Sequence, residues 1–233
     1  MRIVSWNCNG AFRRKFNQIS QLDADIYVVQ ECEDPNRCTQ NGYREWSKDF
    51  LWIGDSKNKG LGIFSPKGIT LEPLDWSSIY QDHEVKYFLP CLVNEDTQLL
   101  GVWTHRNNSP NFGYMGQFWK YLQINIDLFK KIIIAGDFNS NAIWDQWDRW
   151  WNHSDVVKIL EERSIKSIYH LINKEVQGKE STPTFWLQKN IEKPYHIDYI
   201  FASNEFQKPI EFIIGNREKW IHLSDHVPII YEV

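Results

Sequence analysis

A carboxylate and an amide stand together at the end of the most apolar stretch of the sequence. Asp137 and Asn139 follow residues 132–136, which read Ile-Ile-Ile-Ala-Gly. Three β-branched residues in a row favour a strand buried on both faces. Positions two apart in an extended chain point to the same side, so both side chains can project over one cleft. Such a carboxylate can take a proton from a water molecule that the amide positions. An Asx turn that closes the strand explains the same pair equally well.

Polar side chains of catalytic type also follow other apolar segments along the whole sequence. They are Asn7, Glu31, His105, Asp198, Asp225 and His226. Each alone has an ordinary explanation, such as a turn residue or a surface charge. Asp198 is the most informative, because it interrupts the apolar run 197–201 and a buried carboxylate is unfavourable without a partner. We therefore expect a donor or a metal ion beside Asp198, in a pocket that gathers these groups.

The elements that must position these groups follow from the spacing of apolar residues. Residues 2–5 and 26–29 read as strands around an amphipathic helix at 12–22, with Arg13, Arg14 and Lys15 on its exposed side. Residues 85–93 and 98–103 read as an antiparallel pair, and an apolar stripe over 115–129 predicts a helix. Residues 165–169, 211–214 and 227–233 read as further strands. Strand–helix–strand units in both halves predict a layered α/β sandwich.

Four tryptophans cluster after the Asp137 segment, at positions 144, 147, 150 and 151. Their spacing of three and four residues favours packing on the core over stacking on a ligand. Ser154 follows them and is expected to cap a helix that runs through Val156, Val157 and Leu160. Tryptophan can also stack on nucleic-acid bases, so both readings apply to the twelve tryptophans of the sequence.

Length and composition fit one large globular domain over residues 1–233. Hydrophobic residues make up 42% of the sequence, which is enough for a substantial core, and no linker or repeat divides it. No apolar run is long enough to cross a bilayer and none resembles a signal segment, so we expect a cytoplasmic protein without a membrane partner. Four cysteines without a repeated metal spacing, Cys8, Cys32, Cys38 and Cys91, are expected to be reduced thiols.

The sequence carries a formal net charge of −4. This charge gives no electrostatic argument for tight, sequence-independent binding to DNA. It does not exclude a nuclease, because a cluster of metal-binding carboxylates is itself acidic.

The ordered motifs resemble those of the endonuclease/exonuclease/phosphatase superfamily. They are Trp6-Asn7-Cys8-Asn9-Gly10, Gln30-Glu31, Gly136-Asp137-Phe138-Asn139, His196-Ile197-Asp198-Tyr199-Ile200 and Ser224-Asp225-His226-Val227-Pro228. The superfamily includes exonuclease III-like repair nucleases, pancreatic-type deoxyribonucleases, sphingomyelinases and inositol-polyphosphate 5-phosphatases. The resemblance implies a four-layer α/β sandwich, with two mixed β-sheets packed face to face and helices on the outside. It also implies Mg²⁺- or Mn²⁺-dependent hydrolysis of phosphoesters.

The resemblance assigns a role to each polar group. Glu31 would be the main metal ligand, with Asn7 and Asp225 beside or near the metal. Asp137 would orient and deprotonate the attacking water, and Asn139 would hold that water or a phosphate oxygen. His226 would contact the phosphate, with Asp198 fixing its ring. The chemistry is consistent, because Mg²⁺ prefers oxygen ligands and a carboxylate both orients an imidazole and stabilises its charged form.

Three further positions bear on the substrate. His105 falls where the deoxyribonuclease, sphingomyelinase and phosphatase branches carry a histidine, which puts an abasic-site repair role in doubt, although Tyr114 can also claim this place. Trp186 lies where related nucleases place an aromatic residue near the nucleotide, and a packed core tryptophan explains it equally well. Arg106 is a candidate phosphate contact.

The leading hypothesis is a divalent-metal-dependent phosphodiester hydrolase, a nuclease that acts on DNA or RNA as a monomer. The 5-phosphatase branch is disfavoured, because residues 193–196 lack its tryptophan–cysteine–aspartate–arginine motif. The alternative is a phosphatase or phosphodiesterase of a small phosphorylated metabolite or lipid head group. A catalytically silent binding domain is the third hypothesis, and the intact set of polar groups argues against it.

Overall fold

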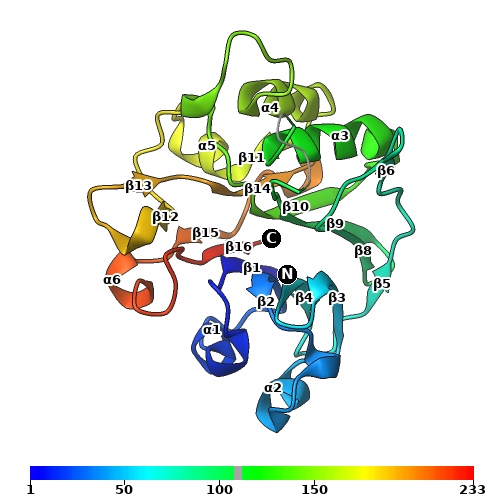
Figure 1. The fold of residues 1–233 in the computed structure, drawn as a ribbon, viewed down its shortest axis with the longest axis vertical. Helices are drawn as coiled ribbons and strands as arrows, with labels where there is room; N and C mark the ends of the chain where they lie inside the picture. Colours follow the sequence, from blue (N-terminus) through cyan, green and yellow to red (C-terminus); the bar gives the residue numbers. More distant parts are fainter. Residues whose placement is uncertain (108–111) are drawn as a thin grey trace.

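Two six-stranded mixed β-sheets pack face to face in the computed structural model, which describes residues 1–107 and 112–233 (Figure 1). The first sheet has the order β15-β16-β1-β2-β4-β3, and only β1 and β2 run parallel in it. Its strands are β1 (Arg2–Asn7), β2 (Ile26–Cys32), β3 (Phe50–Ser56), β4 (Lys59–Phe64), β15 (Glu211–Ile214) and β16 (Ile229–Glu232). Both ends of the chain therefore contribute neighbouring strands to this sheet.

The second sheet has the order β11-β14-β10-β9-β8-β5, and β9 and β10 are its parallel pair. Its strands are β5 (Leu71–Pro73), β8 (Phe88–Val93), β9 (Thr97–Trp103), β10 (Ile132–Asp137), β11 (Lys166–Ser167) and β14 (Asp198–Ala202). Two small ribbons lie outside the sheets, β6 (Ile79–Tyr80) with β7 (His83–Glu84) and β12 (Phe185–Trp186) with β13 (Pro194–Tyr195).

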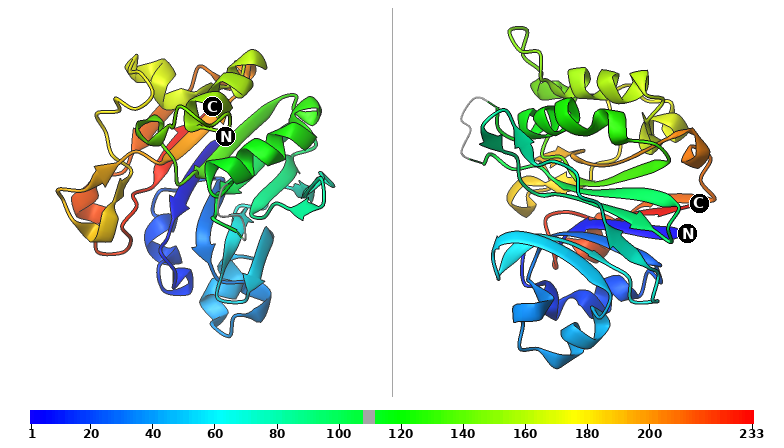
Figure 2. Two further views of the ribbon diagram at one scale, coloured as in Figure 1. Left: turned by 45° about the horizontal axis from the view of Figure 1, so that its top comes forward. Right: turned by 90° about the vertical axis from the view of Figure 1, so that its right-hand side faces the viewer.

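Helices cover the outer face of each sheet (Figure 2). Helices α1 (Phe16–Ser20) and α2 (Asn41–Trp46) lie on the first sheet, where Phe16 and Tyr43 share a core cluster with strand residues of β1 and β2. Helices α3 (Met115–Asn125) and α4 (His153–Glu162) lie on the second sheet through Leu122 and Leu160. The remaining helices are α5 (Ile168–Asn173) and α6 (Arg217–Trp220), with single 3₁₀ turns at Phe12–Arg14, Pro35–Arg37, Ile126–Leu128, Ala142–Trp144, Leu187–Lys189 and Asn204–Phe206.

The central core lies between the two sheets and confirms the predicted sandwich. Ile3 and Val28 of the first sheet pack in one buried cluster with Leu99, Ile133 and Ile200 of the second. Each side chain of this kind stabilises the fold by about 1.5–3 kcal/mol when it is fully removed from water. The order is therefore helices, sheet, sheet, helices, and the apolar strands that precede the polar motifs form the two middle layers.

Several local predictions are confirmed. The strands predicted at 211–214 and the antiparallel pair of β8 and β9 are present, and all four cysteines are free thiols. In the described part of the chain, no helix has the length and apolar character needed to span a bilayer. The two ends of the chain lie side by side, because the backbone N–H of Val233 donates a hydrogen bond to the carbonyl of Met1 at 3.0 Å.

The predicted helix at 12–22 is wrong in its length. A 3₁₀ turn at Phe12–Arg14 and the short helix α1 replace it, because Ala11 has a left-handed φ of 53° and Lys15 has a φ of −119° between the two. Lys15 also turns inward, and its Nζ donates to the carbonyl of Cys8 at 2.6 Å. This hydrogen bond explains why Lys15 is half-buried rather than on the solvated face.

The predicted strand at 165–169 is also mostly wrong. Only Lys166 and Ser167 pair with β14, and helix α5 begins at Ile168. Ser167 is the extended N-cap residue, and its hydroxyl lies 2.7 Å from the Nδ1 of His170 in the first helical turn. The cap of α4 is Asn152 rather than Ser154, because the side chains of Asn152 and Asp155 form a reciprocal capping box.

The prediction that the clustered tryptophans pack on the core is wrong for most of them. Trp147 is 97% exposed, Trp150 is 62% exposed and Trp144 is 43% exposed. The spacing of the tryptophans would place them on one face only in a helix, but residues 145–152 form a loop. Trp147 and Trp150 belong to this loop, which protrudes before α4 at the top of Figure 1, and Trp144 ends the 3₁₀ turn before it.

Candidate active site

Two carboxylates and an imidazole meet at one end of the sandwich. The Nδ1 of His226 lies 2.9 Å and 3.2 Å from the two carboxylate oxygens of Asp198. Asp137 completes the group, because one ligand atom from each of the three side chains lies within 4.8 Å of the others. All three residues are buried. Asp198 thus has the donor that its position in an apolar strand predicted.

The register of the second sheet places the two carboxylates. Asp137 is the last residue of β10 and pairs directly with Asp198, the first residue of β14. On the other side of β10, a Cβ at Gly136 would lie only 1.8 Å from the carbonyl oxygen of Val102 on β9. Glycine is therefore required before Asp137, because any side chain would push β9 and β10 apart.

Two amide side chains hold the Asp137 carboxylate, one from the first sheet and one from the loop that follows β10 of the second sheet. The Nδ2 of Asn7, at the end of β1, donates to Asp137 Oδ2 at 2.9 Å. The Nδ2 of Asn139 donates to the same oxygen at 2.9 Å, and its backbone N–H donates to Oδ1 at 2.8 Å. Asn139 adopts a left-handed φ of 44°, which Asn tolerates better than most residues. The predicted Asx turn and the predicted convergence of Asp137 and Asn139 are thus both present.

The segment that carries His226 is fastened to the first sheet. The Ser224 hydroxyl donates to the carbonyl of Asn7 at 2.7 Å and accepts from the N–H of His226 at 3.1 Å. The Nε1–H of Trp6 donates to the carbonyl of His226 at 3.1 Å. The imidazole is therefore held both by the Asp198 carboxylate and by a fixed backbone.

Burial and neighbouring charges shift the pKa values in this cluster. Burial raises the pKa of Asp137, and Asp198 raises it further, while the His226 charge and the hydrogen bonds of Asn7 and Asn139 oppose the shift, which leaves it at about 7. Burial alone would lower the pKa of His226, but the negative charges of Asp198 and Asp137 outweigh burial and raise it to about 9. The geometry thus favours a charged imidazole beside a carboxyl group that can exchange a proton near neutral pH.

Glu31 and Asp225 lie on the segments that flank Asn7. Glu31 follows Gln30, the partner of Asn7 in the parallel β1–β2 pair, and it adopts a left-handed φ of 64° at a bulge in the β2–β4 pairing. Its carboxylate forms an ion pair with Lys59 at 2.8 Å. Asp225 is partly exposed, and its Oδ1 lies 3.5 Å from the Ser224 hydroxyl.

His105 and Tyr114 lie beside the loop after Asp137, residues 138–141, which we name the catalytic loop. The backbone N–H of Tyr114 donates to the carbonyl of His105 at 2.9 Å. The carbonyl of Thr104, just before His105, accepts from Asn139 Nδ2 at 3.1 Å. Burial and the positive charge of Lys59 lower the pKa of His105, while Glu31 and Asp55 oppose this. The structure thus brings both candidates for this place to the rim of the site.

Trp186 lies in the core rather than in the cleft. It is 7% exposed and packs in the cluster beneath the first sheet, with the Arg217 guanidinium 5.6 Å from its ring centre. Its neighbour Phe185 is the aromatic residue of this segment that meets the site, because its ring centre lies 4.5 Å from that of His226. Of the two explanations open from the sequence, the structure favours core packing for Trp186.

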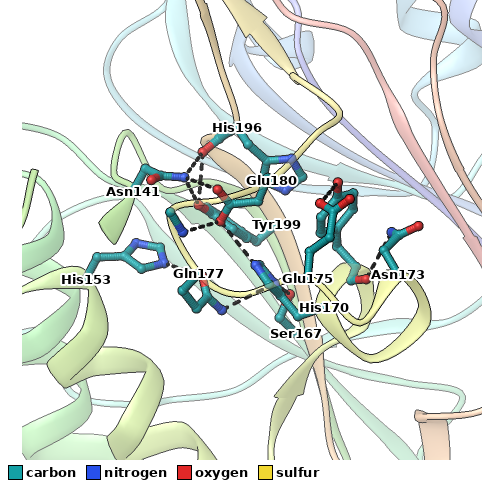
Figure 3. A network of polar contacts seen from close by, with 12 residues as sticks. Asn141, His153, Ser167, His170, Asn173, Glu175, Gln177, Glu180, His196 and Tyr199 are labelled. Carbon is teal, nitrogen blue, oxygen red and sulfur yellow. Dashed lines mark hydrogen bonds and ion pairs between the residues drawn. The ribbon is translucent and has the colours of Figure 1, made fainter. Parts of the chain in front are cut away.

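A buried polar network supports the catalytic loop from behind (Figure 3). The Nδ2 of Asn141 lies 3.0 Å from Glu180 Oε2, 2.9 Å from the carbonyl of His196 and 3.0 Å from the hydroxyl of Tyr199. The second oxygen of Glu180 accepts from the backbone N–H of Gly178 at 3.0 Å and lies 3.1 Å from His170 Nε2. Asn141 therefore ties the loop after Asp137 to the strand that carries Asp198.

Sequence reasoning missed this network and one further support. The Thr184 hydroxyl accepts from the backbone N–H of Ile197 at 3.0 Å and of Asp198 at 3.1 Å. Asn141 was the easier to find, because it continues the alternation of Asp137 and Asn139 by one step. Glu180 and Thr184 carry no such signal, since neither follows a strand end in the same alternation.

Known structures share this fold at low sequence identity. The "3'-5' exonuclease (NExo) from Neisseria Meningitidis" aligns with a TM-score of 0.74 and 18% identity over 100% of this chain and 99% of its own. A variant described as "3' phosphatase NExo" from Neisseria, "bound to product DNA hairpin", aligns with a TM-score of 0.71 and 18% identity. The alignment covers 100% of this chain and 98% of that one. An AP endonuclease from Archaeoglobus fulgidus aligns with a TM-score of 0.68 and 17% identity, over 99% of this chain and 98% of its own. No protein of curated function matches the sequence.

The sequence also matches a family model over nearly its full length. The model is described as "Endonuclease/Exonuclease/phosphatase family", and it covers residues 4–226. These bounds include every group assembled above, from Asn7 on β1 to His226 before β16. The chain belongs to the endonuclease/exonuclease/phosphatase family and is a phosphoric ester hydrolase.

Proposed function

We propose that the chain is a divalent-metal-dependent phosphodiesterase that acts as a nuclease on DNA or RNA. The observation that carries this proposal is the meeting of His226, Asp198 and Asp137 in one buried group, with Asp137 held by two amides. An oriented cationic imidazole suits an anionic phosphate, and a positioned carboxylate suits the activation of water. These two functions are those that in-line hydrolysis of a phosphoester requires.

His226 is the proposed phosphate contact. Its Nδ1 is engaged by Asp198, so its Nε2–H is the group left to donate to a phosphate oxygen. The positive charge favoured by Asp198 and Asp137 then stabilises the charge that develops on the phosphoryl oxygens. Asp198 acts through the imidazole and does not itself contact the substrate.

Asp137 is the proposed acceptor for the proton of the attacking water. Asn7 and Asn139 fix the direction of its carboxylate, which reduces the reorganisation needed in the transition state. A pKa raised to about 7 suits a base that works near neutral pH. Asn139 is partly exposed and remains able to meet the water or a phosphate oxygen.

Glu31, Asn7 and Asp225 are the proposed ligands of Mg²⁺ or Mn²⁺. The donor chemistry fits, because all three offer oxygen atoms and lie on neighbouring segments at the same end of the sandwich. The Glu31 carboxylate pairs with the Lys59 ammonium at 2.8 Å, so a metal ion would take the place of this partner. When bound, the ion would neutralise negative charge on the phosphate and the leaving group.

A phosphomonoesterase is the second candidate. One similar structure is described as a 3' phosphatase bound to product DNA. The oriented imidazole and carboxylate serve a terminal phosphate by the same chemistry, so the substrate decides between the two activities.

The test uses small substrates and nucleic acids with matched variants. A bis-aryl phosphodiester, a mono-aryl phosphate, single-stranded DNA, plasmid and RNA are each incubated with Mg²⁺, Mn²⁺ or EDTA. We expect turnover of the diester and of nucleic acid with metal and none with EDTA. Asp137→Asn and His226→Ala should each lower kcat by about 10² or more. His222→Ala removes an exposed histidine nearby and should have no effect. Unchanged turnover in both site variants would refute the assignment.

A further inference from the structure

Two exposed tryptophans shortly before α4, Trp144 and Trp150, border a pocket beside the catalytic loop. The pocket has a volume of about 850 Å³, within the range of about 300–1,000 Å³ for ligand sites. Its wall includes Asn139 of the catalytic loop together with Trp144, Trp150, Trp151, Arg106 and Arg149. We call this feature the tryptophan pocket. It is continuous with the proposed reaction centre through Asn139, so a substrate can reach both at once.

The rings that line this pocket are held on a fixed backbone. The carboxylate of Asp145 accepts from the backbone N–H of His153 at 2.9 Å and of Ser154 at 3.3 Å. The side chain of Asn152 accepts from the N–H of Gln146 at 2.9 Å and donates to the carbonyls of Gln146 and Arg149. Because the loop is cross-linked in this way, little further ordering is needed before a ligand stacks on its rings.

The chemistry of the wall matches an unpaired nucleotide. Trp144 and Trp150 each leave part of their ring open to solvent, while Trp144 packs on Tyr195 and Trp150 contacts Phe112. Arg106 and Arg149 add two guanidinium groups to the same wall, where Asp145 and Asp148 are also found. Arg149 lies 4.8 Å from the ring centre of Trp151. Rings that stack on bases and cations that meet phosphates are the combination found in sites for single-stranded nucleic acid.

A duplex fits this wall less well. The faces of paired bases are covered by their neighbours in the stack, so tryptophan rings can reach them only when the strand is unpaired. The net charge of −4 likewise favours stacking over general attraction to phosphates as the source of affinity.

We propose that the tryptophan pocket binds unpaired nucleotides next to the scissile phosphate, by stacking of bases on Trp144 and Trp150. This inference rests on the proposed nuclease function, because it takes the pocket as the extension of that reaction centre. The substrate class that it names is a single-stranded nucleic acid, or a single-stranded end, rather than an intact duplex.

Binding is measured first without catalysis, by fluorescence anisotropy in EDTA. The probes are a labelled oligothymidylate, the same backbone with abasic residues in place of the bases, and a duplex of equal length. The wild-type protein should bind the oligothymidylate about tenfold or more tighter than the other two. Trp144→Ala with Trp150→Ala should remove most of this preference, and Trp150→Phe should retain part of it. Trp147→Ala is the matched control, since Trp147 is in the same loop but does not line the pocket.

Three outcomes would overturn the inference. One is equal binding of the abasic backbone, a second is stronger binding of the duplex, and the third is an equal loss in Trp147→Ala. Turnover of the bis-aryl phosphodiester separates this inference from the proposed function. In the double variant the KM for the oligonucleotide should rise more than the KM for that small substrate, while Trp147→Ala should change neither. If the wild type turns over no phosphoester but still binds bases through Trp144 and Trp150, the proposed hydrolysis fails and the pocket assignment stands.

Discussion

Replacing Glu180 with glutamine tests whether the buried network behind the catalytic loop supports both the fold and turnover. The Glu180 side chain is 3% exposed, and its carboxylate has Asn141, His170 and Gly178 as hydrogen-bond partners (Figure 3). Glutamine keeps the shape of the side chain but removes the charge and brings an NH₂ group toward these donors. Asn141 should then shift, and it is two residues from Asn139.

The magnitude follows from the pKa of Glu180. Burial opposes ionisation, but hydrogen bonds from His170, Asn141 and backbone N–H groups outweigh it and lower the pKa from 4.5 to about 2. The difference corresponds to about 3 kcal/mol of unfolding free energy at neutral pH. Because the pKa is depressed in the folded state, this stabilisation is present above pH 4.5 and is lost as the pH falls toward 2.

The assay is urea unfolding of the wild type and Glu180→Gln at several pH values, followed by kinetics. At pH 7 we expect the variant to lose about 2–3 kcal/mol, and near pH 3 about half of that difference should remain. The kcat for the bis-aryl phosphodiester should fall about tenfold through misplacement of the loop, with little change in KM. Glu161→Gln, an exposed position on α4, is the control and should change neither quantity.

The reasoning would be refuted by a Glu180→Gln variant as stable as the wild type at pH 7. A loss of the same size at pH 7 and pH 3 would also refute it, because the stabilisation would then not come from the ionised carboxylate. A destabilised variant with normal kcat would separate the two claims and leave only the structural one.

Three further predictions follow from the structure. Burial lowers the pKa of the His153 imidazole to about 4, so on acidification the unfolded state binds a proton at this residue before the folded state does. The free energy of unfolding should therefore fall by up to about 3 kcal/mol between pH 6.5 and pH 4. His153→Phe should reduce this pH dependence, measured by urea unfolding. Gly136→Ala should lower Tm and activity together, at a cost of about 1–3 kcal/mol or more, because its Cβ would meet the carbonyl of Val102. Asp198→Asn should lower kcat by about 10²–10⁴ with an unchanged circular dichroism spectrum, because the His226 ring loses its orienting carboxylate.

Local rules were sufficient for the strands that carry the reactive groups. The apolar runs before Asp137 and around Asp198 are determined by burial on both faces of a sheet, which the residue types reveal directly. The requirement that a buried carboxylate must have a partner then predicted a donor for Asp198, and His226 is that donor.

Sequence patterns failed where the backbone leaves regular structure. The tryptophans at 144, 147 and 151 have helical spacing, yet the side chains of Asp145 and Asn152 hold the segment as a loop. Periodicity describes which residues would share a face if a helix formed, and it contains no information about the side-chain hydrogen bonds that prevent one. The partners of Asn141 fall outside prediction for a similar reason, because they lie 39 to 58 residues away along the chain.

The pairing of Asp137 with Asp198 is unfavourable for stability at the site that we propose for hydrolysis. Two buried acidic residues stand directly opposite each other on neighbouring strands, where like charges are unfavourable. One imidazolium on His226 can compensate only part of this repulsion. Asp137→Asn should therefore raise Tm in EDTA while it removes turnover, even though two accepted hydrogen bonds are lost. A lower Tm for this variant would show that the amide donors of Asn7 and Asn139 contribute more than the paired charges cost.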